Sequence, residues 1–170
     1  MDQRANFEET TLLHLDAAYN LARWLTNDAS DAEDVVQEAY LRAFRFFAGF
    51  RGGDSRAWVL KIVRNTFYTW LQRNHAHENL TEIEDDIADA KAEDPETLLI
   101  AKLDLQVLMQ LVKELPRPFC EVIVMRDIEE LSYKEISIVT GLPLGTVMSR
   151  LARARRRLQA DALRRVGGER

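Results

Sequence analysis

Apolar residues recur every three or four positions along most of this chain, a pattern that predicts an all-α protein. The first stripe runs from Phe7 to Leu25 and includes Leu12 and Leu15. A second falls within residues 30–47, where Ser30 and Glu33 are spaced to cap the helix start. Further helices are expected over residues 56–74, 98–115 and 119–125.

A helix-turn-helix is predicted between residues 132 and 158. Ser132 and Glu135 have the spacing of a capping box, so a helix should begin there, and Gly141 suits its left-handed end. Pro143 then fits the entry to a second helix. The buried stripe of that helix is expected to comprise Val147, Leu151, Ala154 and Leu158.

The opposite face of this second helix is small, hydroxylic and rich in arginine. It carries or is flanked by Thr146, Ser149, Arg150, Arg153, Arg156 and Arg157. Arginine can form paired hydrogen bonds to guanine and to phosphate, so such a face suits the major groove of DNA. A solvated basic helix, or one lying on an acidic partner or a membrane, is the alternative. The combination of a capped helix, a glycine turn and a second amphipathic helix favours the DNA reader.

Charge divides the chain into three blocks. The net charge of −5 is made up of −1 in residues 1–74, −8 in residues 75–97 and +4 in residues 98–170. The strongly acidic middle block is mostly polar and reads as a linker. We therefore expect two small helical domains, residues 1–74 and 98–170, joined by an acidic linker over residues 75–97, with the helix-turn-helix in the second domain.

Two features of the first block bear on binding. Leu41 lies among Asp34, Gln37 and Glu38 on the polar side of its helix, which indicates a docking surface, although a solvated charged face is the simpler reading. After the glycine-rich loop 48–55, with Ser55 as the expected cap, a helix interleaves aromatic and basic residues. This composition fits contact with unpaired bases, and it also fits core packing.

Catalytic and metal-binding chemistry is not indicated. The single cysteine, Cys120, lies in an apolar run and is expected to be a buried core residue rather than a nucleophile. His75 and His77 lack a third ligand, so neither a metal nor another cofactor is expected. We find no apolar run long enough to cross a membrane and no leader. These observations predict a cytoplasmic protein that is not an enzyme and has no small-molecule substrate.

Three segments together resemble a known family. They are DAEDVVQEAYLRAF, FRGGDSRAWVLKIVRN and LSYKEISIVTGLPLGTVMSRLARARRRL, in this order and spacing. The chain is similar over roughly residues 7–158 to bacterial RNA polymerase sigma factors of the extracytoplasmic-function (ECF) group of the sigma-70 family. Members of that group have a promoter-melting domain and a domain that reads the minus-thirty-five element.

The resemblance implies a role for each matching residue. Residues on the polymerase-docking surface would be Asp34, Gln37, Glu38 and Leu41. The loop that holds a flipped minus-ten base would comprise Phe50, Arg51, Asp54 and Ser55, and the helix beside the melted strand would contribute Trp58, Lys61, Arg64 and Asn65. The minus-thirty-five element would be read by Thr146, Ser149, Arg150 and Arg153. Met148 stands where many members carry lysine, which puts one DNA contact in doubt.

The expected partners are therefore core RNA polymerase, promoter DNA and an anti-sigma factor. A sigma-like decoy that binds only an anti-sigma protein and a free-standing helix-turn-helix regulator are the alternatives. The opposite charges of the linker and the second domain also predict a compact free state, in which the two domains fold together and the recognition helix is partly covered.

Overall fold

The computed structural model describes residues 2–74 and 103–168, and every regular element within these two ranges is helical. The first range contains α1 (Gln3–Thr11), α2 (Leu15–Thr26), α3 (Ala29–Phe46) and α4 (Ser55–Asn74), with short 3₁₀ helices η1 (Leu12–His14) and η2 (Phe47–Gly49). The second contains α6 (Leu105–Glu114), α7 (Arg117–Ile123), the π-helical segment η3 (Val124–Ile128), α8 (Tyr133–Thr140) and α9 (Leu144–Gly167). The all-α prediction is thus confirmed. The predicted linker, residues 75–97, lies outside the described residues.

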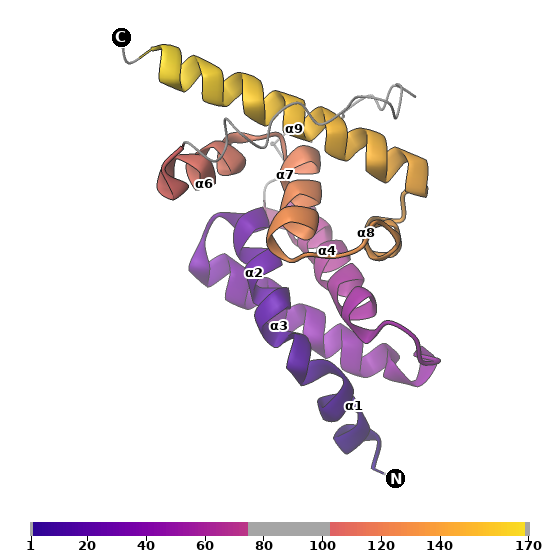
Figure 1. The fold of residues 1–170 in the computed structure, drawn as a ribbon. Coiled ribbons are helices and arrows are strands. Elements are labelled where there is room, and N and C mark those ends of the chain that lie inside the picture. Colours follow the sequence, from indigo (N-terminus) through magenta and orange to yellow (C-terminus); the bar gives the residue numbers. More distant parts are fainter. Residues whose placement is uncertain (1, 75–102, 169–170) are drawn as a thin grey trace.

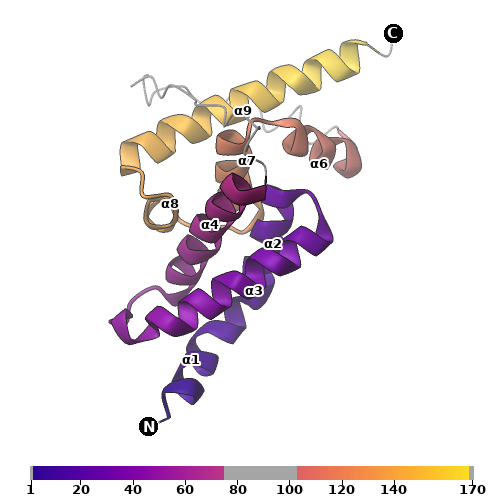
Figure 2. The ribbon, with the colours of Figure 1, turned by 180° about the vertical axis from the view of Figure 1, so that it is seen from behind.

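In the first domain, α2, α3 and α4 pack side by side around one apolar core (Figure 2). Their facing sides are lined by small and branched residues that are almost fully buried, among them Ala18, Leu21, Val35, Leu60, Val63 and Phe67. In the second domain, α9 packs on α6, α7 and α8 through its apolar stripe. Cys120 is buried in this second core, as expected, and burial raises the pKa of its thiol to about 12.

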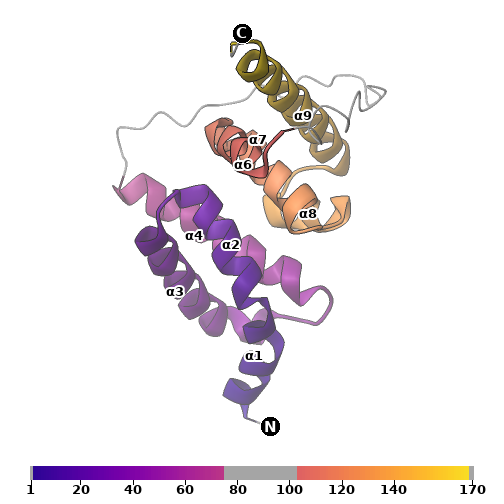
Figure 3. The same cartoon turned by 60° about the vertical axis from the view of Figure 1, so that its left-hand side comes forward.

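The two domains also pack directly against each other. Helix α4 of the first domain lies along α8, and α2 contacts α7. Helix α9 lies on the far side of the second domain, with α7 and α8 between it and the first domain (Figures 1 and 3). The predicted compact arrangement is therefore present, but the main contact is made by α7 and α8 rather than by α9.

Several helix starts differ from the sequence-based expectations. Helix α3 is capped by Asp28, whose carboxylate accepts from the Asp31 amide at 2.9 Å, so the prediction that Ser30 is the cap is wrong. Helix α4 is capped by Asp54, which accepts from the Ala57 amide at 3.0 Å, so Ser55 is not the cap. In both cases the aspartate lies one or two residues upstream, where its carboxylate can reach the first free amides.

The predicted first helix, which was expected to run without a break from Phe7 to Leu25, is interrupted by η1. The hydroxyl of Tyr40 donates to the carbonyl of Thr11 at 2.8 Å and thereby holds the break from α3. The break changes which residues face inward, so Leu12 and Leu15 are exposed instead of buried.

Candidate functional site

The helix-turn-helix has the local geometry that its sequence predicts. The hydroxyl of Ser132 accepts from the Glu135 amide, and the Glu135 carboxylate accepts from the Ser132 amide, both at 3.1 Å, so the capping box is complete. Gly141 ends α8 with φ 73°, a left-handed conformation that a side chain disfavours. Pro143 lies at the start of α9. These three features fix the angle at which α9 leaves the turn.

The four arginines of α9 that were expected to contact DNA differ in their exposure. Arg156 and Arg157 are exposed, while Arg153 is half-buried with its guanidinium 5.6 Å from the ring centroid of Phe119. Arg150 is only 9% exposed and belongs to the packed side of the helix. The outward face near the turn carries the half-buried Thr146 and Ser149 and the exposed Met148.

The loop before α4 is fixed at both of its ends. The ring of Phe50 lies against Trp58 and Phe47, with centroids 5.0 and 6.0 Å apart. Gly52 and Gly53 have φ of 86° and 91°, so this turn requires glycine. Asp54 caps α4, and the Ser55 hydroxyl lies 2.8 Å from Nε2 of His14. Arg51, at the tip of the loop, is exposed.

The residues predicted to lie beside a melted strand point in two directions. Lys61 and Asn65 are exposed on the outer side of α4. Arg64 points instead into the boundary between the domains, where it binds Glu121 of α7 through two hydrogen bonds of 2.8 and 2.9 Å. Trp58 is half-buried against the core, in keeping with a structural role.

Glu121 is the most deeply buried acidic residue in the described ranges, with no exposed surface. Besides Arg64 it accepts from the hydroxyl of Tyr68 at 3.2 Å. The Arg64 guanidinium also lies 4.7 Å from the centroid of the Tyr68 ring. Burial opposes the charge on Arg64, but Glu121 outweighs this effect and raises the pKa of the guanidinium. Arg64 therefore keeps its charge at the domain boundary.

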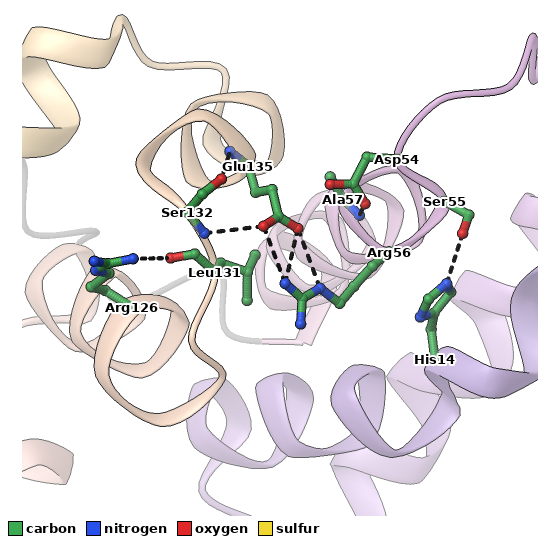
Figure 4. Close-up of polar contacts among 9 residues, drawn as sticks. All are labelled: His14, Asp54, Ser55, Arg56, Ala57, Arg126, Leu131, Ser132 and Glu135. Atoms are coloured by element: carbon green, nitrogen blue, oxygen red, sulfur yellow. Dashed lines mark hydrogen bonds and ion pairs between the residues drawn. The ribbon is translucent and has the colours of Figure 1, made fainter.

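A second ion pair joins the domains at the start of the helix-turn-helix (Figure 4). The Arg56 guanidinium donates to both carboxylate oxygens of Glu135, at 3.0 and 3.1 Å, while Glu135 also accepts from the Ser132 amide. Burial alone would raise the pKa of the Glu135 carboxyl, but these donors hold the pKa below its ordinary 4.5. Glu135 therefore completes the capping box of α8 and also binds Arg56 of α4 across the domain boundary.

The predicted docking face lies along α3, where three of its four residues are exposed. Asp34 and Gln37 are exposed, and Leu41 is 64% exposed. Glu38 is half-buried and accepts from Arg42 at 2.9 Å and from Arg73 at 2.7 Å. The face is therefore less acidic than the sequence suggests, and its prominent feature is an apolar side chain.

An open groove of about 510 Å³ between α1 and α3 continues this face. Its lining residues are Arg4, Phe7, Glu8, Leu12, Gln37, Tyr40, Leu41 and Phe44. Two of them, Gln37 and Leu41, belong to the predicted docking face. The groove could not be predicted from the sequence because Leu12 faces outward only as a result of the η1 break.

Three residues with structural importance at these surfaces were not predicted to have it: Glu121, Glu135 as an interdomain anchor, and His14. Glu121 lies in an otherwise apolar run, Phe119 to Met125, and an isolated acid there is the signal that marks a buried pair. Arg56 and Glu135 are far apart in the sequence, and nothing local indicates their contact.

Among the described residues, no cluster of three or more histidine, cysteine, aspartate or glutamate side chains is arranged to hold a metal ion. No helix in the described ranges is both long and apolar enough to span a bilayer.

The fold and its surfaces define a two-domain helical protein with a DNA-binding helix-turn-helix. Known proteins identify it more closely. The model for sigma-70 region 2 matches residues 12–77, and the model for sigma-70 region 4 matches residues 105–158. The chain is 34% identical over 165 residues to the ECF RNA polymerase sigma factor SigE of Mycolicibacterium smegmatis, covering 93% of this chain and 63% of that protein.

It is also 31% identical over 136 residues to the ECF RNA polymerase sigma-E factor of Escherichia coli, which covers 75% of this chain and 71% of the relative. The structure is similar to that of the sigma factor RpoE in complex with the anti-sigma factor NepR from Bartonella quintana, with a TM-score of 0.69 and 27% identity. That match covers 94% of this chain and 97% of the other. This chain belongs to the ECF sigma factors of the sigma-70 family.

Proposed function

We propose that this chain directs core RNA polymerase to a specific set of promoters and helps to melt the DNA at the start site. The observation that carries the proposal is the presence of sigma-70 region 2 and region 4 in one chain, in that order, on the two helical domains. It acts in the cytoplasm by binding and not by catalysis. No small molecule or metal takes part in this proposal.

The minus-thirty-five element is read by the outward face of α9. Thr146, Ser149 and Arg153 contact bases near the turn, and the exposed Arg156 and Arg157 bind phosphates further along the helix. Arg150 is nearly buried in the described conformation, so a base contact by this residue requires its side chain to swing outward. Arg150 therefore has the weakest structural support in this set.

Minus-ten recognition and melting are assigned to the loop 50–55 and to α4. Phe50, Arg51, Asp54 and Ser55 surround the position of the flipped base, and Lys61, Arg64 and Asn65 accompany the melted strand. The exposure of Arg51, Lys61 and Asn65 supports this assignment. Arg64 must first exchange the carboxylate of Glu121 for DNA.

Core polymerase is bound by the α3 face of Asp34, Gln37, Glu38 and Leu41. The neighbouring groove supports this proposal because it adds apolar surface beside the exposed Leu41, and the buried core of a protein interface is apolar. An apolar side chain of polymerase would enter the groove beside Leu41.

An anti-sigma factor would hold the chain silent. The similarity to RpoE in its complex with NepR extends over both domains, which supports this partner. The direct packing of α4 on α8 supports a closed resting state that such a partner could stabilise. A decoy without DNA contacts is disfavoured by the exposed arginines of α9.

The proposal is tested by reconstitution. The full chain is mixed with core RNA polymerase, and the complex is isolated and used to transcribe a fragmented genomic library in vitro. Discrete start sites that share two spaced sequence elements are expected, and they should be absent with core polymerase alone. Stable binding to polymerase without any new start site would favour the decoy, and no binding to polymerase would favour the free-standing regulator.

A further inference from the structure

His14 is buried, although the leucines beside it in the sequence are exposed. It is only 8% exposed, whereas Leu12, Leu13 and Leu15 are 49%, 69% and 42% exposed. Burying a leucine stabilises a fold, while burying an imidazole costs free energy unless its nitrogens are hydrogen-bonded. A buried histidine beside exposed leucines therefore needs a hydrogen bond that offsets the cost of burying the imidazole.

The compensating contact crosses to the start of α4. Nε2 of His14 lies 2.8 Å from Oγ of Ser55, a good hydrogen-bond distance (Figure 4). The η1 break places the imidazole there, and the hydrogen bond from Tyr40 to the Thr11 carbonyl maintains the break. Burial and the charge of Arg56 lower the pKa of His14, against the opposing influence of Asp54, so the ring is neutral at neutral pH.

Ser55 is the last residue of the loop to which base recognition is assigned. The backbone there is already held by the Asp54 cap and by the packing of Phe50 on Trp58. Neither contact controls the direction of the Ser55 hydroxyl. Of the described side chains, the one hydrogen-bonded to that hydroxyl is His14.

We propose that His14 is a positioning residue for minus-ten recognition, which fixes the rotamer of the Ser55 side chain without touching DNA itself. This inference rests on the proposed function of the loop. If the imidazole accepts the hydroxyl proton, the Ser55 oxygen presents lone pairs to a base; if the imidazole donates, the hydroxyl presents its proton. In either case the Ser55 side chain is held in one rotamer before the base arrives, which sharpens discrimination between bases.

The test uses holoenzyme reconstituted from core polymerase and the full chain. A promoter selected by the wild-type protein is altered to each of the other bases at every position of its minus-ten element, and transcription of the set is compared. The variants are His14→Ala, His14→Gln, Ser55→Ala and the double variant His14→Ala with Ser55→Ala. Thr26→Val is the matched control, because it removes a hydrogen bond of the first domain, from the Thr26 hydroxyl to the Ala22 carbonyl at 2.8 Å, that belongs neither to the loop nor to the η1 break.

We expect His14→Ala and Ser55→Ala each to reduce the ratio of best to worst base about five- to tenfold at one and the same position, as loss of one hydrogen bond implies. The double variant should lose no more than either single one, and His14→Gln, which can still reach Ser55, should restore part of the ratio. Thr26→Val should keep the ratio while losing some stability. Dependence on the minus-thirty-five element should be unchanged throughout.

The inference is overturned if His14→Ala keeps the wild-type ratio, or if it lowers transcription equally from every template, including one with a pre-melted bubble. Should His14→Ala fail to fold, Ser55→Ala and His14→Gln examine the same bond, and an unchanged ratio in Ser55→Ala is decisive against it. Failure of the proposed function looks different, because the wild-type holoenzyme would then select no promoter at all.

Discussion

The guanidinium of Arg64 in α4 binds the fully buried carboxylate of Glu121 in α7, with the closest atoms 2.8 Å apart, across the boundary between the two domains. Arg64 is also assigned to the melted DNA strand. One side chain thus has two competing partners, a carboxylate in the closed protein and a phosphate or base in the open complex. Domain closure and promoter melting should therefore exclude each other at this residue.

Replacing Arg64 should open the protein. Removing one partner of a buried ion pair costs about 3–5 kcal/mol when the other charge stays buried. Here the cost can be avoided, because separation of the domains returns Glu121 to water. Arg64→Ala is expected to increase the radius of gyration in small-angle scattering while each domain stays folded by circular dichroism.

Asn65→Ala is the control for this experiment, since Asn65 is exposed on the same helix. It should leave the radius of gyration unchanged and slow open-complex formation, as measured by permanganate footprinting. An Arg64→Ala variant as compact as wild type would show that the ion pair does not hold the domains together.

The helix-turn-helix could be predicted almost completely from the sequence, because its capping box and its glycine turn are local signals. The start of α4 could not be predicted in the same way. Asp54 and Ser55 are both residue types that cap helices, and the conformation of the backbone decides which of them accepts from the first free amides. The contacts of Glu121 and Glu135 were beyond prediction for a different reason. They join residues 57 and 79 positions away in the sequence, and no periodicity carries that information.

The site predictions divided in the same way. Exposure of Asp34, Gln37 and Leu41 follows from helical periodicity and was foreseeable. The low exposure of Arg150 was not, because it lies at the edge of the stripe, where neighbouring helices determine whether an arginine is covered. The resemblance to sigma factors supplied the functional roles, which periodicity alone leaves open.

Glu135 should contribute to stability in two separable ways. Glu135→Ala removes both the capping box and the ion pair with Arg56, and loss of a cap alone costs about 1 kcal/mol. Glu135→Gln retains the capping box but loses the charge. We expect Glu135→Ala to lower the urea midpoint of the second domain, and Glu135→Gln chiefly to weaken domain packing. Equal midpoints for the two variants would contradict this separation.

Stability should depend on pH through His14. The folded pKa lies below the ordinary 6.5, so the unfolded chain binds more protons between the two values. The contribution of His14 is therefore complete above about pH 6.5 and is lost as the pH falls through the folded pKa. Urea unfolding of His14→Gln should show a weaker decline between about pH 7 and pH 5 than wild type. A parallel decline would assign the pH dependence to other groups.

Substitutions of the arginines of α9 should distinguish residues that pack in the fold from residues that bind DNA. Arg156→Ala is expected to keep the stability of the fold and to reduce the salt slope of binding to a minus-thirty-five duplex by about one, the value for one phosphate contact. Arg153→Ala should cost about 1–3 kcal/mol and shift preference at one base pair. Arg150→Ala should instead lower stability, because its side chain is packed. Fluorescence anisotropy at several salt concentrations, paired with thermal unfolding, distinguishes these outcomes.

Polymerase binding should depend on Leu41 more than on the acidic residues around it. Leu41 is 64% exposed, so Leu41→Ser exposes no core and should change the free energy of unfolding by less than about 0.5 kcal/mol. If Leu41 packs against an apolar side chain that enters the groove, the same change should weaken binding to core polymerase at least tenfold, about 1.4 kcal/mol. Leu13→Ser is the matched control, because Leu13 is 69% exposed and does not line the groove.

Glu38→Lys should weaken binding less than Leu41→Ser, since Arg42 and Arg73 already compensate the Glu38 charge. Equal polymerase affinities for Leu41→Ser and Leu13→Ser would place the docking surface elsewhere on the first domain.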